Sequence, residues 1–307
     1  MSDIILNLVL FAVSLAVLLK ASDWFITGAE KIGLSFGVAP FIIGVTIIAF
    51  GTSLPELATS IASVLSGKSE IVIGNIIGSN ITNIALVIGV VAIVSKEIKI
   101  ENDIMNIDMP KLLASALLLW FILQDLHVSI FEAIICLVGI VIFLLYTVSA
   151  DRIVDKDQLP KATWKDYLML FAGGVLVYFS AGFTIDFVSE FAIGVGIPLK
   201  IVGLTLVALG TSFPELIVSV QAARKGKTGI AIGNVLGSNV FNTFLVLGIP
   251  RFFGNLIIPP DTLTFSLPMM LALTLLFAFM CVTRRISRWE GLILLLIYVY
   301  FISELFK

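Results

Sequence analysis

Charged residues are scarce in this sequence: Asp, Glu, Lys and Arg make up 13% of its 307 residues. An average soluble domain has about 25%. The formal net charge is −2, so no basic excess points to a nucleic acid as a partner. Histidine occurs once, as His127, with no histidine or cysteine pattern around it, which favours an interfacial loop residue. The two cysteines, Cys136 and Cys281, lie far apart in apolar runs, which favours buried thiols over a disulfide or a metal site.

Apolar residues are correspondingly abundant in the sequence. They make up 59% of the chain, and the mean hydropathy is +1.12. This composition is typical of a protein whose main partner is the lipid bilayer, and the chain is long enough for about ten spans of about 20 residues. The N-terminus does not read as a signal peptide, because Asp3 stands where a basic residue is expected and the apolar run is uninterrupted.

The apolar runs predict an all-α polytopic membrane protein with ten transmembrane helices. The runs are 4–19 (extending towards 34), 38–66, 70–94, 104–124, 129–149, 166–188, 200–223, 229–250, 263–282 and 289–305. The polar connection 151–165 divides the chain into two halves of five spans, 1–150 and 166–307. Because five is odd, the second half begins on the opposite side of the membrane, so the two halves form an inverted repeat.

Basic residues predict the orientation of these spans. With the N-terminus outside, fourteen Lys and Arg residues fall on inside connections and four on outside ones, with Lys20 left unassigned. Cytoplasmic connections carry the excess of basic residues in membrane proteins. The sequence therefore predicts a multi-pass protein of the cell membrane, with both termini outside and the 151–165 connection in the cytoplasm.

One sequence motif occurs twice, in residues 42–90 and 201–249. The copies align without a gap at an offset of 159, and 24 of 49 positions are identical. Each copy places a Gly-Thr-Ser-x-Pro-Glu break and a Gly-Ser-Asn-x-x-Asn segment inside an apolar stretch. Paired interruptions in corresponding halves are the best sequence pointer to a transporter's binding site.

The first segment reads Gly51-Thr-Ser-Leu-Pro-Glu56, and Gly210 to Glu215 repeats it. Proline has no N–H and its ring clashes with the carbonyl four residues before it, so each helix should bend or unwind there and leave carbonyls without partners. The inverted repeat should bring the two breaks together near the midplane. An ionisable residue at that depth is a functional-site hypothesis by default.

The second segment reads Gly74-Asn-Ile-Ile-Gly-Ser-Asn-Ile-Thr-Asn83, and Gly233 to Asn242 repeats its pattern. Glycines four apart favour close helix packing. The Ser and the final Asn of each copy are also four apart and share one helix face. The pooled site offers two carboxylates, hydroxyls, amides and carbonyls, a set of oxygen donors that suits hard cations such as Ca²⁺, Mg²⁺ or Na⁺. Two glutamates balance one Ca²⁺ or two Na⁺, which suits an antiporter.

The two motifs resemble the α-repeats of the calcium/cation antiporter superfamily, and most closely those of prokaryotic sodium/calcium exchangers. The resemblance implies alternating access by sliding of spans 1 and 6, with Na⁺ exchanged for Ca²⁺, three to one and electrogenically. We expect no cofactor, and no obligatory protein partner is evident from the sequence. The resemblance also implies four cation positions, with the glutamates and threonine carbonyls at Ca²⁺, serines and alanine carbonyls at Na⁺, and two asparagines at the centre. The matching residues are Glu56, Glu215, Thr52, Thr211, Ser53, Ser212, Ser79, Ser238, Asn83, Asn242, Ala49 and Ala208.

Two departures from some relatives bear on function. Asn242 stands where the potassium-dependent branch carries aspartate, which argues against K⁺ co-transport. The connection of about 16 residues between the halves is too short for the Ca²⁺-sensing domains of animal exchangers.

Other classes of protein fit the sequence less well. A H⁺/Ca²⁺ exchanger on the same fold is the alternative, because proton coupling could use the two glutamates without the serines. A channel is disfavoured, because pores commonly use rings of ligands from several subunits. An intramembrane hydrolase is disfavoured because a hydroxyl and amide shell surrounds the acids.

Overall fold

The computed structural model describes residues 2–100, 108–149, 161–195, 210–260 and 262–305. Its first half begins with one long helix, α1 (Ser2–Ser35), followed by a broken helix and then a second interrupted one. The broken helix consists of α2 (Pro40–Ile43), the π-helical η1 (Gly44–Ile48), α3 (Ala49–Thr52) and α4 (Leu54–Leu65); the next consists of α5 (Glu70–Thr82), η2 (Asn83–Ile88) and α6 (Gly89–Ser95). Two continuous helices, α7 (Met109–Leu123) and α8 (Ile130–Ser149), follow.

The described residues of the second half follow the same order. It begins with the long helix α9 (Trp164–Gly194), and α11 (Phe213–Arg224) follows the second break. The next interrupted helix consists of α12 (Thr228–Phe241), the π-helical η5 (Asn242–Val246) and α13 (Leu247–Arg251). Then come η6 (Thr262–Ser266) with α14 (Leu267–Val282), and finally α15 (Arg288–Glu304). The sequence did not predict the π-helical turns, two of which, η2 and η5, begin at the repeated asparagines Asn83 and Asn242. Such turns are frequent at functional sites.

Helices occur in every one of the ten predicted runs, but their lengths differ. Among the described residues, seven helices are long and apolar enough to cross a membrane. Helices α7 and α15 are shorter, and the run 200–223 lies partly outside the described residues. Most of the predicted polar connection, residues 151–160, lies outside them as well. The predicted total of ten spans and the division at 151–165 therefore stay predictions.

The expectation of helices alone needs one correction. Strands β1 (Glu97–Lys99) and β2 (Arg285–Ser287) form a short antiparallel sheet in which Ile98 faces Ile286. Both isoleucines are fully buried, whereas the residues on either side of them are exposed or half-buried. This alternation with a period of two is the pattern of a half-buried strand, and it is too short to stand out among long apolar runs.

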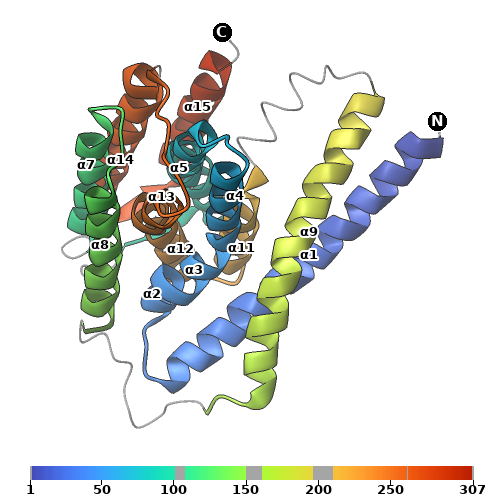
Figure 1. The fold of residues 1–307 in the computed structure, drawn as a ribbon. Coiled ribbons are helices and arrows are strands. Elements are labelled where there is room, and N and C mark those ends of the chain that lie inside the picture. Colours follow the sequence, from blue (N-terminus) through green and yellow to red (C-terminus); the bar gives the residue numbers. More distant parts are fainter. Residues whose placement is uncertain (1, 101–107, 150–160, 196–209, 261, 306–307) are drawn as a thin grey trace.

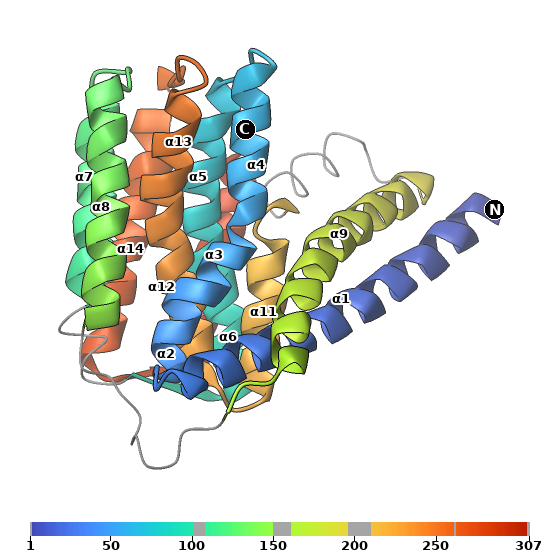
Figure 2. The same cartoon turned by 60° about the horizontal axis from the view of Figure 1, so that its bottom comes forward.

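The connections between helices gather at two ends of the molecule. At one end, His127 pairs with Ile257, whose N–H bonds the hydroxyl of Ser69. At the other end the β1–β2 sheet forms (Figure 2), and there Lys31 pairs with Asp166. Cys136 and Cys281 are free and buried, as the sequence predicts.

Helices α1 and α9 cross each other and form a pair beside the other helices (Figures 1 and 2). Their backbones touch where glycine permits it. A Cβ on Gly28 would lie 2.5 Å from the backbone nitrogen of Leu170, and one on Gly173 would lie 2.6 Å from that of Phe25. In contrast to this peripheral pair, the helix Thr228–Arg251 lies at the centre: 94% of its most apolar stretch is buried, against 17% for Ile4–Ser35.

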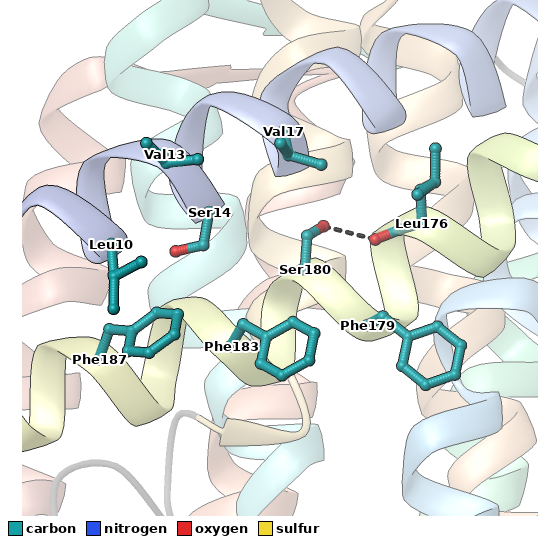
Figure 3. Close-up of a pocket in the computed structure, with 9 residues that line it drawn as sticks. All are labelled: Leu10, Val13, Ser14, Val17, Leu176, Phe179, Ser180, Phe183 and Phe187. Atoms are coloured by element: carbon teal, nitrogen blue, oxygen red, sulfur yellow. Dashed lines mark hydrogen bonds between the residues drawn. The ribbon is translucent and has the colours of Figure 1, made fainter. Parts of the chain in front are cut away.

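A cavity of about 330 Å³ opens between the outer parts of α1 and α9 (Figure 3). Its walls are almost entirely apolar, and they include Val13, Phe183 and Phe187. The hydroxyls of Ser14 and Ser180 in its wall donate to carbonyls of their own helices, those of Phe11 and Leu176. The cavity therefore offers no free polar group to an ion, and it is separate from the repeated motifs.

Candidate ion-binding site

In both repeats a helix begins directly after the serine of the Gly-Thr-Ser-x-Pro-Glu segment. Ser53 separates α3 from α4 with φ −84° and ψ 0°, and Ser212 precedes α11 with φ −85° and ψ 4°. Pro55 and Pro214 then occupy the first turns of α4 and α11, where a missing N–H costs no helical bond. The two serines thus have the same backbone conformation, and the segments around them differ at one position, Leu54 in the first and Phe213 in the second.

The acids that follow the breaks, Glu56 and Glu215, are completely buried. The two carboxylates are close enough to repel each other electrostatically. Both side-chain oxygens of Glu56 and one of Glu215 find no hydrogen-bond partner among the described residues. Burying a carboxylate without a counter-charge or hydrogen bonds is costly. The pair thus has the chemistry of a site that needs cations.

Asparagines from the opposite repeat hold the threonines beside the breaks. The hydroxyl of Thr52 donates to Asn234 Oδ1 at 3.0 Å, and the hydroxyl of Thr211 donates to Asn75 Oδ1 at 3.0 Å. Since Thr211 and Asn234 are the repeat equivalents of Thr52 and Asn75, the two bonds are related by the internal symmetry. The amide groups of Asn234 and Asn75 also donate to the backbone carbonyls of Glu215 and Glu56.

The contacts between hydroxyls and carboxylates inside the site are longer. Glu215 Oε1 lies 3.4 Å from Ser53 Oγ and 3.5 Å from Ser238 Oγ. The oxygens of Thr52 and Ser238 are 3.4 Å apart, as are those of Ser79 and Thr211. Typical O–H···O hydrogen bonds span about 2.7–2.8 Å. The site oxygens therefore bond one another only weakly.

The two central asparagines also bond across the repeats. Asn83 Nδ2 donates to Asn239 Oδ1 at 3.1 Å, and Asn242 Nδ2 donates to Asn80 Oδ1 at 3.3 Å. The amide oxygens of Asn83 and Asn242 accept no hydrogen bond among the described residues. Each amide thus donates to a neighbouring asparagine, and its oxygen remains available to bind a cation.

The structure brings most of the predicted site residues together. Thr211 and Ser212 lie near the Glu56 carboxylate without a hydrogen bond to it, and the hydroxyls of Ser53 and Ser238 contact Glu215. Ala49 is buried at the start of α3, and its carbonyl accepts from the backbone N–H of Ser53 at 3.0 Å. The carbonyl of Ala49 thus keeps its helical hydrogen bond. The carbonyl of Gly51 lacks one, because the residue four positions later is Pro55, which has no N–H. The predicted ligand Ala208 lies outside the described residues.

Several polar residues of the site were not singled out by the sequence analysis. They are Asn75, Asn80, Asn234 and Asn239, together with Ser60 and Ser219, which accept from the amides of Asn75 and Asn234. Their signal was present, because each of these residues is identical in the two copies of the motif. Spacing alone could not separate them from the neighbouring ligand candidates.

Oxygen atoms make up the donor set of the candidate site. Among the described residues, no group of three or more His, Cys, Asp or Glu residues that could hold a metal ion occurs. Two carboxylates amid neutral oxygens suit hard cations. The fold and the site together define a polytopic membrane protein with a buried oxygen site between two repeated halves.

Comparison with known proteins places this architecture in a family. Residues 6–149 and 165–306 match the model of the sodium/calcium exchanger protein family. The chain is 36% identical to the sodium/calcium exchanger MaX1 of Methanosarcina acetivorans, covering 99% of both chains, and 33% identical to the putative antiporter CaxA of Alkalimonas amylolytica, covering 96% of this chain and 97% of CaxA. The chain belongs to the sodium/calcium exchanger family.

A solved structure agrees in fold. The sodium-calcium exchanger NCX_Mj, in crystals soaked with 100 mM Na⁺ and 10 mM Sr²⁺, superimposes with a TM-score of 0.85 at 31% identity, covering 98% of each chain. These relatives are named as exchangers or as an antiporter, not as enzymes.

Proposed function

We propose that this protein exchanges Na⁺ for Ca²⁺ across the cell membrane by alternating access, with Glu56 and Glu215 as the central Ca²⁺ ligands. The observation that carries the proposal is the pair of completely buried acids, because both carboxylate oxygens of Glu56 and one of Glu215 have no hydrogen-bond partner among the described residues. A cation offsets the cost of burying two such carboxylates, and carboxylate oxygens are ligands that Ca²⁺ prefers.

Coupling to Na⁺ is favoured by the neutral oxygens around the acids. Ser53 and Ser238 lie next to Glu215, Ser79 lies 3.4 Å from Thr211, and the buried Ser212 lies near Glu56. A proton would need only the carboxylates, whereas Na⁺ needs a shell of oxygen ligands. Two carboxylates are neutralised by one Ca²⁺ or two Na⁺. A third Na⁺ would therefore make the exchange electrogenic, at three Na⁺ per Ca²⁺.

Ten spans in two inverted halves complete the proposal. The internal contacts support the predicted sides, because connections predicted on one side contact one another: 66–69, 125–129 and 251–258 meet at one end. The connections that hold Lys31, Lys99, Lys227 and Arg285 meet at the other end. We assign the second, more basic end to the cytoplasm and both termini to the outside.

The test is ⁴⁵Ca²⁺ uptake into proteoliposomes loaded with Na⁺, compared with K⁺-loaded and acid-loaded vesicles. Uptake that requires the outward Na⁺ gradient, and that responds to an imposed membrane potential, would support electrogenic Na⁺/Ca²⁺ exchange. Uptake driven by the proton gradient and indifferent to Na⁺ would establish the second candidate, a H⁺/Ca²⁺ exchanger. Absence of gradient-driven uptake in all three would contradict both.

A further inference from the structure

Asn75 and Asn234 occupy equivalent places between the two breaks. Each accepts a hydrogen bond from the threonine of the opposite repeat and donates to the backbone carbonyl of the glutamate in its own repeat. Each also donates to a serine one turn beyond that glutamate, Ser60 at 3.2 Å or Ser219 at 2.9 Å. Every hydrogen-bonding group of the two amides is thus directed at a part of the candidate site.

The orientation of these amides follows from their partners. A backbone carbonyl can only accept, so the NH₂ group of Asn75 must face Glu56 and that of Asn234 must face Glu215. The amide oxygens then face Thr211 and Thr52, whose hydroxyls must act as donors. The hydrogen of each threonine hydroxyl is therefore turned away from the carboxylates.

We propose that Asn75 and Asn234 are positioning residues for ion binding. Each accepts a hydrogen bond from the hydroxyl of the opposite threonine, so that this hydroxyl presents only oxygen lone pairs to the site. The same bond also links the two breaks to one another. Outer groups that orient metal ligands in this way commonly change metal affinity about 10–100-fold when they are removed. The inference rests on the proposed function, because it assumes that Ca²⁺ and Na⁺ bind between the breaks.

A purely structural role would have a different signature. Buried asparagines that only satisfy polar groups would lower stability when replaced, whichever threonine is changed with them. Positioning predicts crossed pairing: Asn234 should act through Thr52, and Asn75 through Thr211. The chain provides its own matched control, because the same four residues recombine into the pairs Thr52 with Asn75 and Thr211 with Asn234, between which no hydrogen bond is described.

The experiment is a set of double-mutant cycles read by equilibrium binding of ⁴⁵Ca²⁺ to the purified full-length protein, with Na⁺ as competitor. The variants are Thr52→Val, Thr211→Val, Asn234→Leu and Asn75→Leu, with Thr→Ser at both threonines as the conservative rescue. Each of the four variants is expected to weaken Ca²⁺ binding about tenfold. The double variants of a crossed pair, Thr52 with Asn234 or Thr211 with Asn75, should bind Ca²⁺ at most about threefold more weakly than their single variants. The reason is that either single replacement already removes the hydrogen bond between the two residues.

The matched doubles within one repeat should instead multiply to about a 100-fold loss. Thr→Ser should bind as the wild type does, since it keeps the hydroxyl. If Asn→Leu at either position fails to fold, Asn→Ser replaces it in the same cycle. Equal coupling in the crossed and within-repeat pairs, in a wild type that binds Ca²⁺, would overturn the inference and leave the proposed function standing. A wild type that binds no Ca²⁺ would overturn both.

Discussion

The side-chain amide of Asn83 donates to the amide oxygen of Asn239, 156 residues further along the chain, at 3.1 Å. The repeat equivalents of these residues form the equivalent bond, in which Asn242 donates to the amide oxygen of Asn80 at 3.3 Å. Together with the crossed threonine bonds, these contacts run from one repeat to the other in symmetric pairs. Neither half of the chain can complete the candidate site without its counterpart.

Replacement of either acid should abolish Ca²⁺ binding and, at the same time, stabilise the ion-free protein. Glu56→Gln and Glu215→Gln each remove a buried charge that faces another buried charge, so thermal unfolding in the presence of EDTA should shift upward. The stabilisation that Ca²⁺ gives to the wild type, about 2.7 kcal/mol at 100 times Kd, should be lost. Differential scanning fluorimetry with and without Ca²⁺ measures both effects.

Glu70→Gln is the matched control for these two variants, because Glu70 is exposed in the first turn of α5. It should keep both the Ca²⁺-induced shift and the transport rate. A Gln variant at position 56 or 215 that still shows the full Ca²⁺-induced shift would remove that acid from the site.

The sequence predicted those acids because a proline beside an acid recurs in a long apolar stretch, and local chemistry is enough to read that pattern. It could not predict which asparagine supports which threonine, because the partners lie more than 130 residues apart. The sequence also did not predict the π-helical turns that begin at Asn83 and Asn242, because such a turn changes the backbone hydrogen-bond pattern without requiring a particular composition. Strands β1 and β2 escaped because three-residue elements carry little signal of their own.

Gly237→Ala should destabilise the protein strongly. A Cβ there would lie 2.3 Å from the carbonyl oxygen of Val45 and 2.5 Å from the Cβ of Ala49, so α12 would be pushed from η1 and α3 at the first break. Overpacking of this kind typically costs about 1–3 kcal/mol. Gly182→Ala is the control, because a Cβ at that exposed site in α9 meets no described atom within 4 Å. Comparable melting temperatures for the two variants would contradict the close packing.

Single cysteines should label from opposite sides of the membrane at Lys68 and Lys99. Both side chains are exposed, and Lys99 lies in β1 at the end assigned to the cytoplasm. In right-side-out vesicles, a membrane-impermeant maleimide should modify Lys68→Cys at once and Lys99→Cys only after permeabilisation. The native Cys136 and Cys281 are fully buried and give the background with the unchanged protein. Labelling of both positions from the outside would overturn the assigned orientation.

Asn242 should make Ca²⁺ transport independent of K⁺. Its amide group donates to Asn80, and its fully buried oxygen, which accepts no hydrogen bond among the described residues, can bind a cation without adding charge to the two glutamates. Asn242→Asp would place a third carboxylate in the site, so one Ca²⁺ would leave a net charge of −1 in a medium where an unpaired charge is costly. Ca²⁺ uptake by this variant should fall about tenfold or more, each tenfold step being about 1.4 kcal/mol at the barrier. K⁺ supplied on the Ca²⁺ side should restore part of the rate by neutralising the added charge.

Asn242→Ser, which adds no charge, should lose rate without gaining any response to K⁺. Uptake measured with K⁺ replaced by choline separates these outcomes, and stimulation of the wild type by K⁺ would contradict the role given to Asn242.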